Sequence, residues 1–141
     1  MRKWLVRTLG VLLVFCYSVA AHAENLKLVC DLPAASGQAN GDVANIRADH
    51  YTFEICEGCR VYAPRASLEA YYAKNNIKPA IWHITDTRYQ AEEDGADQNG
   101  NMWAHSVFTI SRADGTFQME YTWHGAKAIS NGKCKKFEPI F

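Results

Sequence analysis

Residues 102–124 read MWAHSVFTISRADGTFQMEYTWH and contain the clearest fold signal in the chain. Apolar and polar residues alternate on both sides of Asp114-Gly115, a dipeptide that favours a two-residue turn between antiparallel strands. With that dipeptide as the turn, Phe108 faces Tyr121, and apolar residues meet along one side of the hairpin. The stretch therefore predicts an antiparallel β-hairpin with one buried face.

The same register brings histidines together on the other face of the hairpin. His105 lies opposite His124, with Cβ atoms about 4.5 to 5.5 Å apart, and pairing of residues 80–87 with residues 102–112 would add His83. Three histidines in a row have the composition of a zinc or copper site. Two other interpretations remain open, namely simple hydrogen bonding on a half-exposed face and a role in proton transfer.

The rest of the chain also indicates strands. Alternation and turn residues predict further strands at 26–32, 50–56, 60–62, 80–87 and 133–137, with loops at 33–41 and 92–101. Leu68, Tyr71, Tyr72 and Asn75 fall at helical spacing after Pro64, which predicts one short helix over 64–75. The expected fold is mainly β, a small antiparallel β-barrel or curved sheet of about six to eight strands.

The first 23 residues have the pattern of a secretory signal peptide. Arg2, Lys3 and Arg7 precede an apolar run, and Ala21-His22-Ala23 is a small-x-small cleavage site. The apolar run of about a dozen residues is too short to span a bilayer. We therefore expect cleavage near Ala23, a single β-rich domain over 24–141, and a periplasmic or extracellular location.

Charge excludes some classes of partner. The full chain has 15 basic and 15 acidic residues, and loss of three basic residues with the signal peptide leaves a net charge of −3. Nucleic acids and anionic membrane surfaces are bound mainly through concentrated positive charge, so neither is an expected partner. The lysines at 133, 135 and 136 are predicted to form the charged outer face of a closing strand at the sheet edge.

Four cysteines remain after cleavage, which in an exported chain favours two disulfides. Of the three possible pairings we expect Cys30 with Cys134, joining the opening and closing strands, and Cys56 with Cys59 across a turn at Glu57-Gly58. A redox role or a metal-ligand role for the Cys-x-x-Cys pair is the alternative. Haem attachment would need a histidine at position 60, where Arg60 stands.

No catalytic motif is present. The chain lacks Gly-x-Ser-x-Gly, a phosphate loop, His-Glu-x-x-His and a dinucleotide fingerprint, so no enzyme class is assigned. The chain resembles small exported bacterial β-domains in three features. These are the cysteine-bearing opening strand, the hairpin at 111–116 and the closing Gly-Lys-Cys-Lys-Lys at 132–136. We expect a non-catalytic binding or interaction protein of the bacterial envelope. The alternative is a zinc- or copper-binding protein that uses His83, His105 and His124.

Overall fold

The computed structural model describes residues 25–138, so the predicted signal peptide at 1–23 lies outside the described residues. The prediction of a mainly β fold with one short helix is confirmed. The elements are β1 (Leu26–Leu32), β2 (Ala35–Ala39), β3 (Asp42–Ile46), β4 (Asp49–Ile55), α1 (Ala66–Lys74), β5 (Ile77–Lys78), β6 (His83–Ile84), β7 (Arg88–Ala96), β8 (Met102–Ser111), β9 (Thr116–Trp123) and β10 (Ala126–Lys136). Between residues 25 and 138, no helix is long and apolar enough to cross a membrane.

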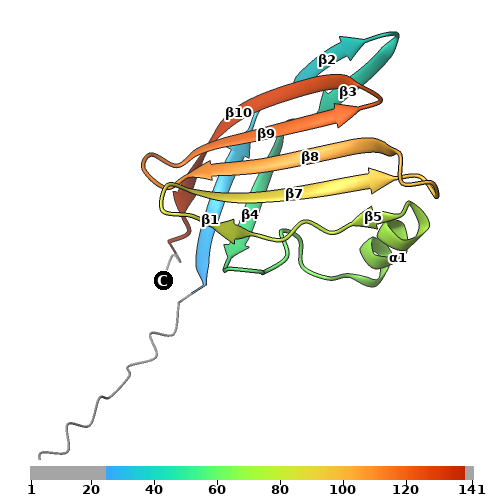
Figure 1. Ribbon diagram of the computed structural model, residues 1–141. Helices are drawn as coiled ribbons and strands as arrows, with labels where there is room; N and C mark the ends of the chain where they lie inside the picture. The colour runs from blue at the N-terminus through green and yellow to red at the C-terminus, as the bar shows by residue number, and fades with distance from the viewer. Residues whose placement is uncertain (1–24, 139–141) are drawn as a thin grey trace, which may run out of the picture.

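The main sheet is antiparallel and curls into a half-barrel, as Figure 1 shows. Its strands follow the order β4-β1-β10-β9-β8-β7-β5, and β6 also pairs with β7. The closing strand β10 therefore lies inside the sheet, where Lys133 is opposite Asp31 on one side and Thr116 on the other. The predicted edge position of the lysine-rich strand is wrong, because β10 is long enough to pair with both β1 and β9.

Residues 26–55 form one long bent hairpin. Leu32 lies opposite Asp49 in the β1–β4 pair, and Ala35 lies opposite Ile46 in the β2–β3 pair, so both pairs follow the same register. Pro33 lies in the break between the two pairs, and its carbonyl accepts a hydrogen bond from the Ser130 hydroxyl of β10. The predicted loop over 33–41 is wrong, since Asn40-Gly41 forms a tight turn with φ values of 53° and 87° between β2 and β3.

The predicted hairpin of β8 and β9 is confirmed, but its predicted register is wrong by two residues. Phe108 lies opposite Met119 rather than Tyr121. The turn is a longer loop over 112–115, closed by the Gly115 N–H, which donates to the Ser111 carbonyl at 3.0 Å. Because the shift is even, every side chain keeps its predicted face, and Phe108 is still buried.

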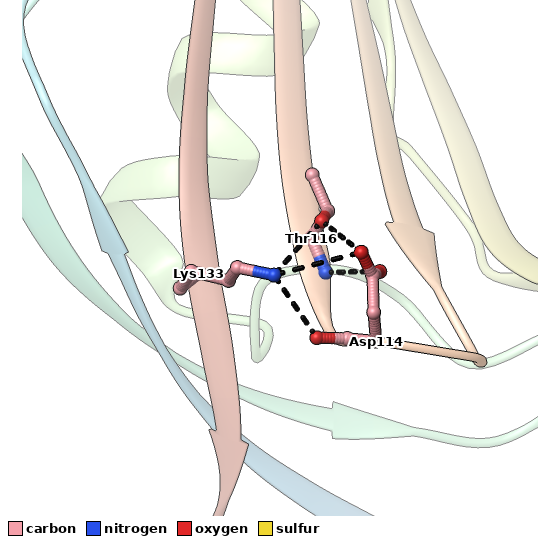
Figure 2. Close-up of polar contacts among 3 residues, drawn as sticks. All are labelled: Asp114, Thr116 and Lys133. Atoms are coloured by element: carbon pink, nitrogen blue, oxygen red, sulfur yellow. Dashed lines mark hydrogen bonds and ion pairs between the residues drawn. The ribbon is translucent and has the colours of Figure 1, made fainter.

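The Asp114 side chain explains the longer loop, as Figure 2 shows. Its carboxylate accepts hydrogen bonds from the Thr116 N–H at 3.0 Å and the Thr116 hydroxyl at 2.8 Å. Lys133 Nζ donates to the Asp114 carbonyl at 3.2 Å, which fixes the loop against β10. Asp114 thus caps the start of β9 instead of sitting at the centre of a two-residue turn.

The predicted acidic loop over 92–101 is only partly a loop. Its first half belongs to β7, which pairs with β8 along its whole length, and Ala91 on β7 is fully buried. The chain reverses over residues 97–101, where the Asp97 carboxylate accepts hydrogen bonds from the N–H groups of Asn99 and Asn101. The predicted direct pairing of residues 80–87 with β8 is therefore wrong, because β7 lies between them.

The core fills the hollow of the half-barrel. Trp82 is fully buried and meets Phe53 edge-on, with 5.3 Å between ring centroids. The β2–β3 hairpin bends over the sheet and adds Ala44 and Ile46 to this core. In Figure 1 the hairpin lies along β10, whereas α1 lies beside β5 at the other side of the sheet.

Both predicted disulfides are present. Cys30 on β1 bonds to Cys134, which lies directly opposite it on β10. Cys56 bonds to Cys59 across a turn in which the Cys59 N–H donates to the Cys56 carbonyl at 3.1 Å. The expected strand over 60–62 is wrong in its partner, because Arg60 forms an isolated bridge with Ile81 rather than pairing with β4.

Candidate functional site

The three histidines singled out in the sequence do not come together. His105 on β8 lies opposite Thr122, so the predicted pairing with His124 is wrong. His124 lies beyond β9, in a two-residue turn with Gly125, and its φ of 45° belongs to that turn. Its ring packs edge-on against Trp123 at a centroid distance of 4.8 Å.

His83 is separated from His105 by an intervening strand. It pairs with Gln90 on β7, and β7 in turn pairs with β8. The Nδ1 atom of His83 lies 3.3 Å from Oε1 of Glu57. Within residues 25–138, no group of three or more His, Cys, Asp or Glu side chains is arranged to hold a metal ion.

His105 instead forms a pair with a carboxylate on the neighbouring strand. Its Nδ1 lies 2.5 Å from Oδ1 of Asp94, directly across the β7–β8 ladder. The pair is partly buried, with side-chain exposures of 23% for His105 and 41% for Asp94. A carboxylate in this position fixes the orientation and tautomer of an imidazole.

Asp94 also lies at one end of a cavity in the sheet edge, which we call the edge notch. Lys78 pairs with Asp94 and His83 pairs with Gln90, but the four residues between them, 79–82, leave β7. They bond instead to the turn segment, where the Trp82 N–H donates to the Cys59 carbonyl at 2.7 Å. Pro79 is the first residue after β5, at the point where the chain departs from β7.

The edge notch has a volume of about 750 Å³ and a mixed lining. Apolar surface comes from Pro79, Ile81 and Ala91, and the rim is polar and charged. The remaining lining residues are Arg60, Lys78, His83, Thr85, Gln90, Glu92 and Asp94. The volume lies within the range of small-ligand sites, and the lining has more polar and charged residues than is usual for such sites.

The main chain of β7 contributes a hydrogen-bonding pair to the notch. The Thr85 N–H donates to the Arg88 carbonyl at 2.9 Å, so Arg88 and every second residue after it direct their backbone groups towards β5 and β6. Glu92 is one of these residues, and it faces the place that residues 79–82 have left. Within residues 25–138 its N–H and C=O have no backbone partner on this side.

A polar cluster beneath α1 supports the wall of the notch. Arg60 Nη1 lies 2.7 Å from Oε1 of Glu69, and the Arg60 guanidinium lies 5.6 Å from the centre of the Tyr72 ring. The Tyr72 hydroxyl donates to Oε2 of Glu93 at 3.0 Å. Burial raises the pKa of Glu93, although the bonds from Tyr72 and the Ala80 N–H favour its charged form.

Sequence reasoning missed this site for a local reason. Residues 80–87 alternate like a strand, and nothing in the pattern separates a strand that pairs throughout from one that leaves its neighbour. Pro79 was the available signal, because proline in a sheet is confined mainly to edge strands and strand ends. In the sequence, Arg60 was considered only because it stands where a haem-attachment motif needs histidine. Its place in the wall of the notch depends on contacts with α1, which the sequence pattern does not show.

Comparisons with known proteins assign no family. No protein-family model and no solved structure matches the chain. The chain is 33% identical over 78 residues to the dermonecrotic toxin LarSicTox-alphaIB2a of Loxosceles arizonica, a match that covers 53% of this chain and 23% of the toxin. The chain thus spans less than a quarter of the toxin's length.

Proposed function

We propose that this chain is an exported, non-catalytic binding protein that holds a small ligand in the edge notch. The observation that carries the proposal is the free backbone of Glu92 inside a cavity of about 750 Å³. Two disulfides support export, because such bonds persist in oxidising compartments such as the bacterial periplasm or the extracellular space. The match to the toxin covers too little of either protein to add an activity.

The notch favours a particular ligand chemistry. A free N–H and a free C=O on one residue are satisfied together by a ligand that has an acceptor beside a donor, as in an amide. The rim carries both signs of charge, with Lys78 at one end and the carboxylates of Glu92 and Asp94 on β7. A neutral or zwitterionic amide therefore fits better than a strongly charged ligand, since net charge of either sign meets a like charge on the rim.

Saturation-transfer NMR with N-acetyl amino acid amides tests this proposal. We expect signal transfer to N-acetyl-leucinamide in the unmodified protein and its loss in Ile81→Trp, because Ile81 lines the notch and a larger side chain fills it. The matched control is Ile129→Trp, a similarly exposed isoleucine on β10 away from the notch. Equal signals in the two variants, or none in the unmodified protein, would contradict the proposal.

A further inference from the structure

The half-barrel has an open side, and β4 forms one wall of it. In the strand order of the main sheet, β4 is terminal and pairs only with β1. The chain continues through the Cys56–Cys59 turn and returns as residues 60–65, which form the facing wall. We call the space between β4 and residues 60–65 the seam.

A hydrogen bond between β1 and the residue after β10 shows which β4 residues turn their backbone N–H and C=O groups towards β1. The Phe137 N–H donates to the Lys27 carbonyl at 3.0 Å, so the backbone groups of Lys27 point towards β10 and those of Leu28 point towards β4. Leu28 lies opposite Phe53, and alternation therefore turns the N–H and C=O of Thr52 and Glu54 into the seam.

These outward backbone groups lack partners where the seam is open. Within residues 25–138, no backbone hydrogen bond reaches Thr52 or Glu54 from residues 60–65. His50, at the start of the same edge, is different because its N–H donates to its neighbour Asp49 at Oδ1, 2.7 Å away. Thr52 and Glu54 thus each keep a free N–H and a free C=O on this edge among the described residues, and they lie two residues apart, which is the repeat of a strand edge.

Two cavities lie along the same stretch of β4. One has a volume of about 540 Å³ and the other about 480 Å³, and both are lined by Thr52, Val61 and Ala63. The first extends under α1 to Leu68 and Tyr71, which give it an apolar end. Because the cavities share residues from both walls, they form a groove that follows the unpaired edge.

We infer that the seam binds an extended peptide from a partner protein, which adds to the sheet as a strand beside β4. The backbone N–H and C=O groups of an extended peptide have the same two-residue spacing as those of Thr52 and Glu54, so the two can pair. Its side chains alternate, so apolar ones enter the cavity at Leu68 and Tyr71 while polar ones face solvent. The edge of a second folded copy fits less well, because residues 60–65 wall the groove on its other side.

Fluorescence anisotropy with the labelled heptapeptide KTVTVTK tests the inference on the disulfide-intact protein. We expect binding, and its loss when the valine nitrogens of the peptide are methylated, because methylation removes main-chain donors and keeps the side chains. Thr52→Pro should weaken binding about tenfold or more, while Thr52→Val, which retains the N–H, should change it less than about threefold. The Thr52 N–H points away from β1, so proline at this edge position leaves the β1–β4 ladder intact.

A second pair of variants does not depend on β4. Ala63→Trp fills the groove from the facing wall and should abolish binding, whereas Ala70→Trp on α1, which lines neither cavity, should not. Failure of KTVTVTK to bind, equal binding of the methylated peptide, or equal effects of Ala63→Trp and Ala70→Trp would each overturn the inference. A dimer that Thr52→Pro converts to monomer would assign the edge to a second copy and overturn it as well.

Discussion

At the scale of single residues, Glu93 connects three parts of the molecule through one carboxylate. It lies on β7, accepts the Tyr72 hydroxyl of α1 at 3.0 Å, and accepts the Ala80 N–H from the segment that leaves the sheet. Burial of this carboxylate raises its pKa, because removal from water disfavours the charged form. The geometry of the edge notch therefore depends on a group whose ionisation costs stability.

This pKa shift predicts a pH dependence of stability. A raised folded-state pKa means that the folded protein binds the Glu93 proton more tightly, so the free energy of unfolding falls as the pH rises above the ordinary value of 4.5. Glu93→Gln cannot ionise, and its stability relative to the unmodified protein should rise with pH in urea unfolding between pH 4 and 8. Glu92→Gln, an exposed neighbour, is the control. If the stability of Glu93→Gln relative to the unmodified protein stays constant or falls as the pH rises, the pKa of Glu93 is not raised in the folded protein.

At the scale of elements, tight turns set the strand registers. Asn40-Gly41 and His124-Gly125 both have positive φ at their two central residues and fix the pairs β2–β3 and β9–β10. Sequence reasoning chose Asp114-Gly115 instead, where the carboxylate bonds to Thr116 lengthen the loop. It assigned Asn40-Gly41 to a loop, although that dipeptide is a strong hairpin signal, because the neighbouring Pro, Ser and Gly residues obscured the strands.

Close packing of the β2–β3 hairpin on β10 gives a prediction at the same scale. A Cβ added at Gly37 would overlap the carbonyl oxygen of Lys127, a backbone atom that cannot rotate away. Gly37→Ala should therefore lower the free energy of unfolding by about 2 kcal/mol or more, because the hairpin must lift from β10. Ser36→Ala, exposed on the same strand, should stay within about 0.5 kcal/mol. Urea unfolding of both variants measures the difference, and equal values would mean that the hairpin is not held this closely.

At the scale of the whole molecule, the sequence predicted what local chemistry encodes and missed what distant segments decide. The mainly β class, the helix and both cysteine pairs follow from alternation, spacing and compartment. The histidine row failed because a register shift of two residues preserves every face and still changes every cross-strand neighbour. The edge notch and the seam were not predicted, since both depend on residues 58–61 and 80–82 bonding to one another instead of to the sheet.

The two disulfides should contribute unequally to the stability of the whole molecule. Cys30–Cys134 joins residues 104 positions apart, and closing so long a loop restricts the unfolded chain by about 4 to 5 kcal/mol in the entropic description. Cys56–Cys59 joins residues 3 positions apart and by the same relation contributes about 2 kcal/mol. Urea unfolding should therefore show a larger loss for Cys30→Ala with Cys134→Ala than for Cys56→Ala with Cys59→Ala. Thiol titration of the denatured, unreduced chain from residue 24 onward should give no signal. Two or more reactive thiols, or equal losses in the two double variants, would contradict this account of the two disulfides.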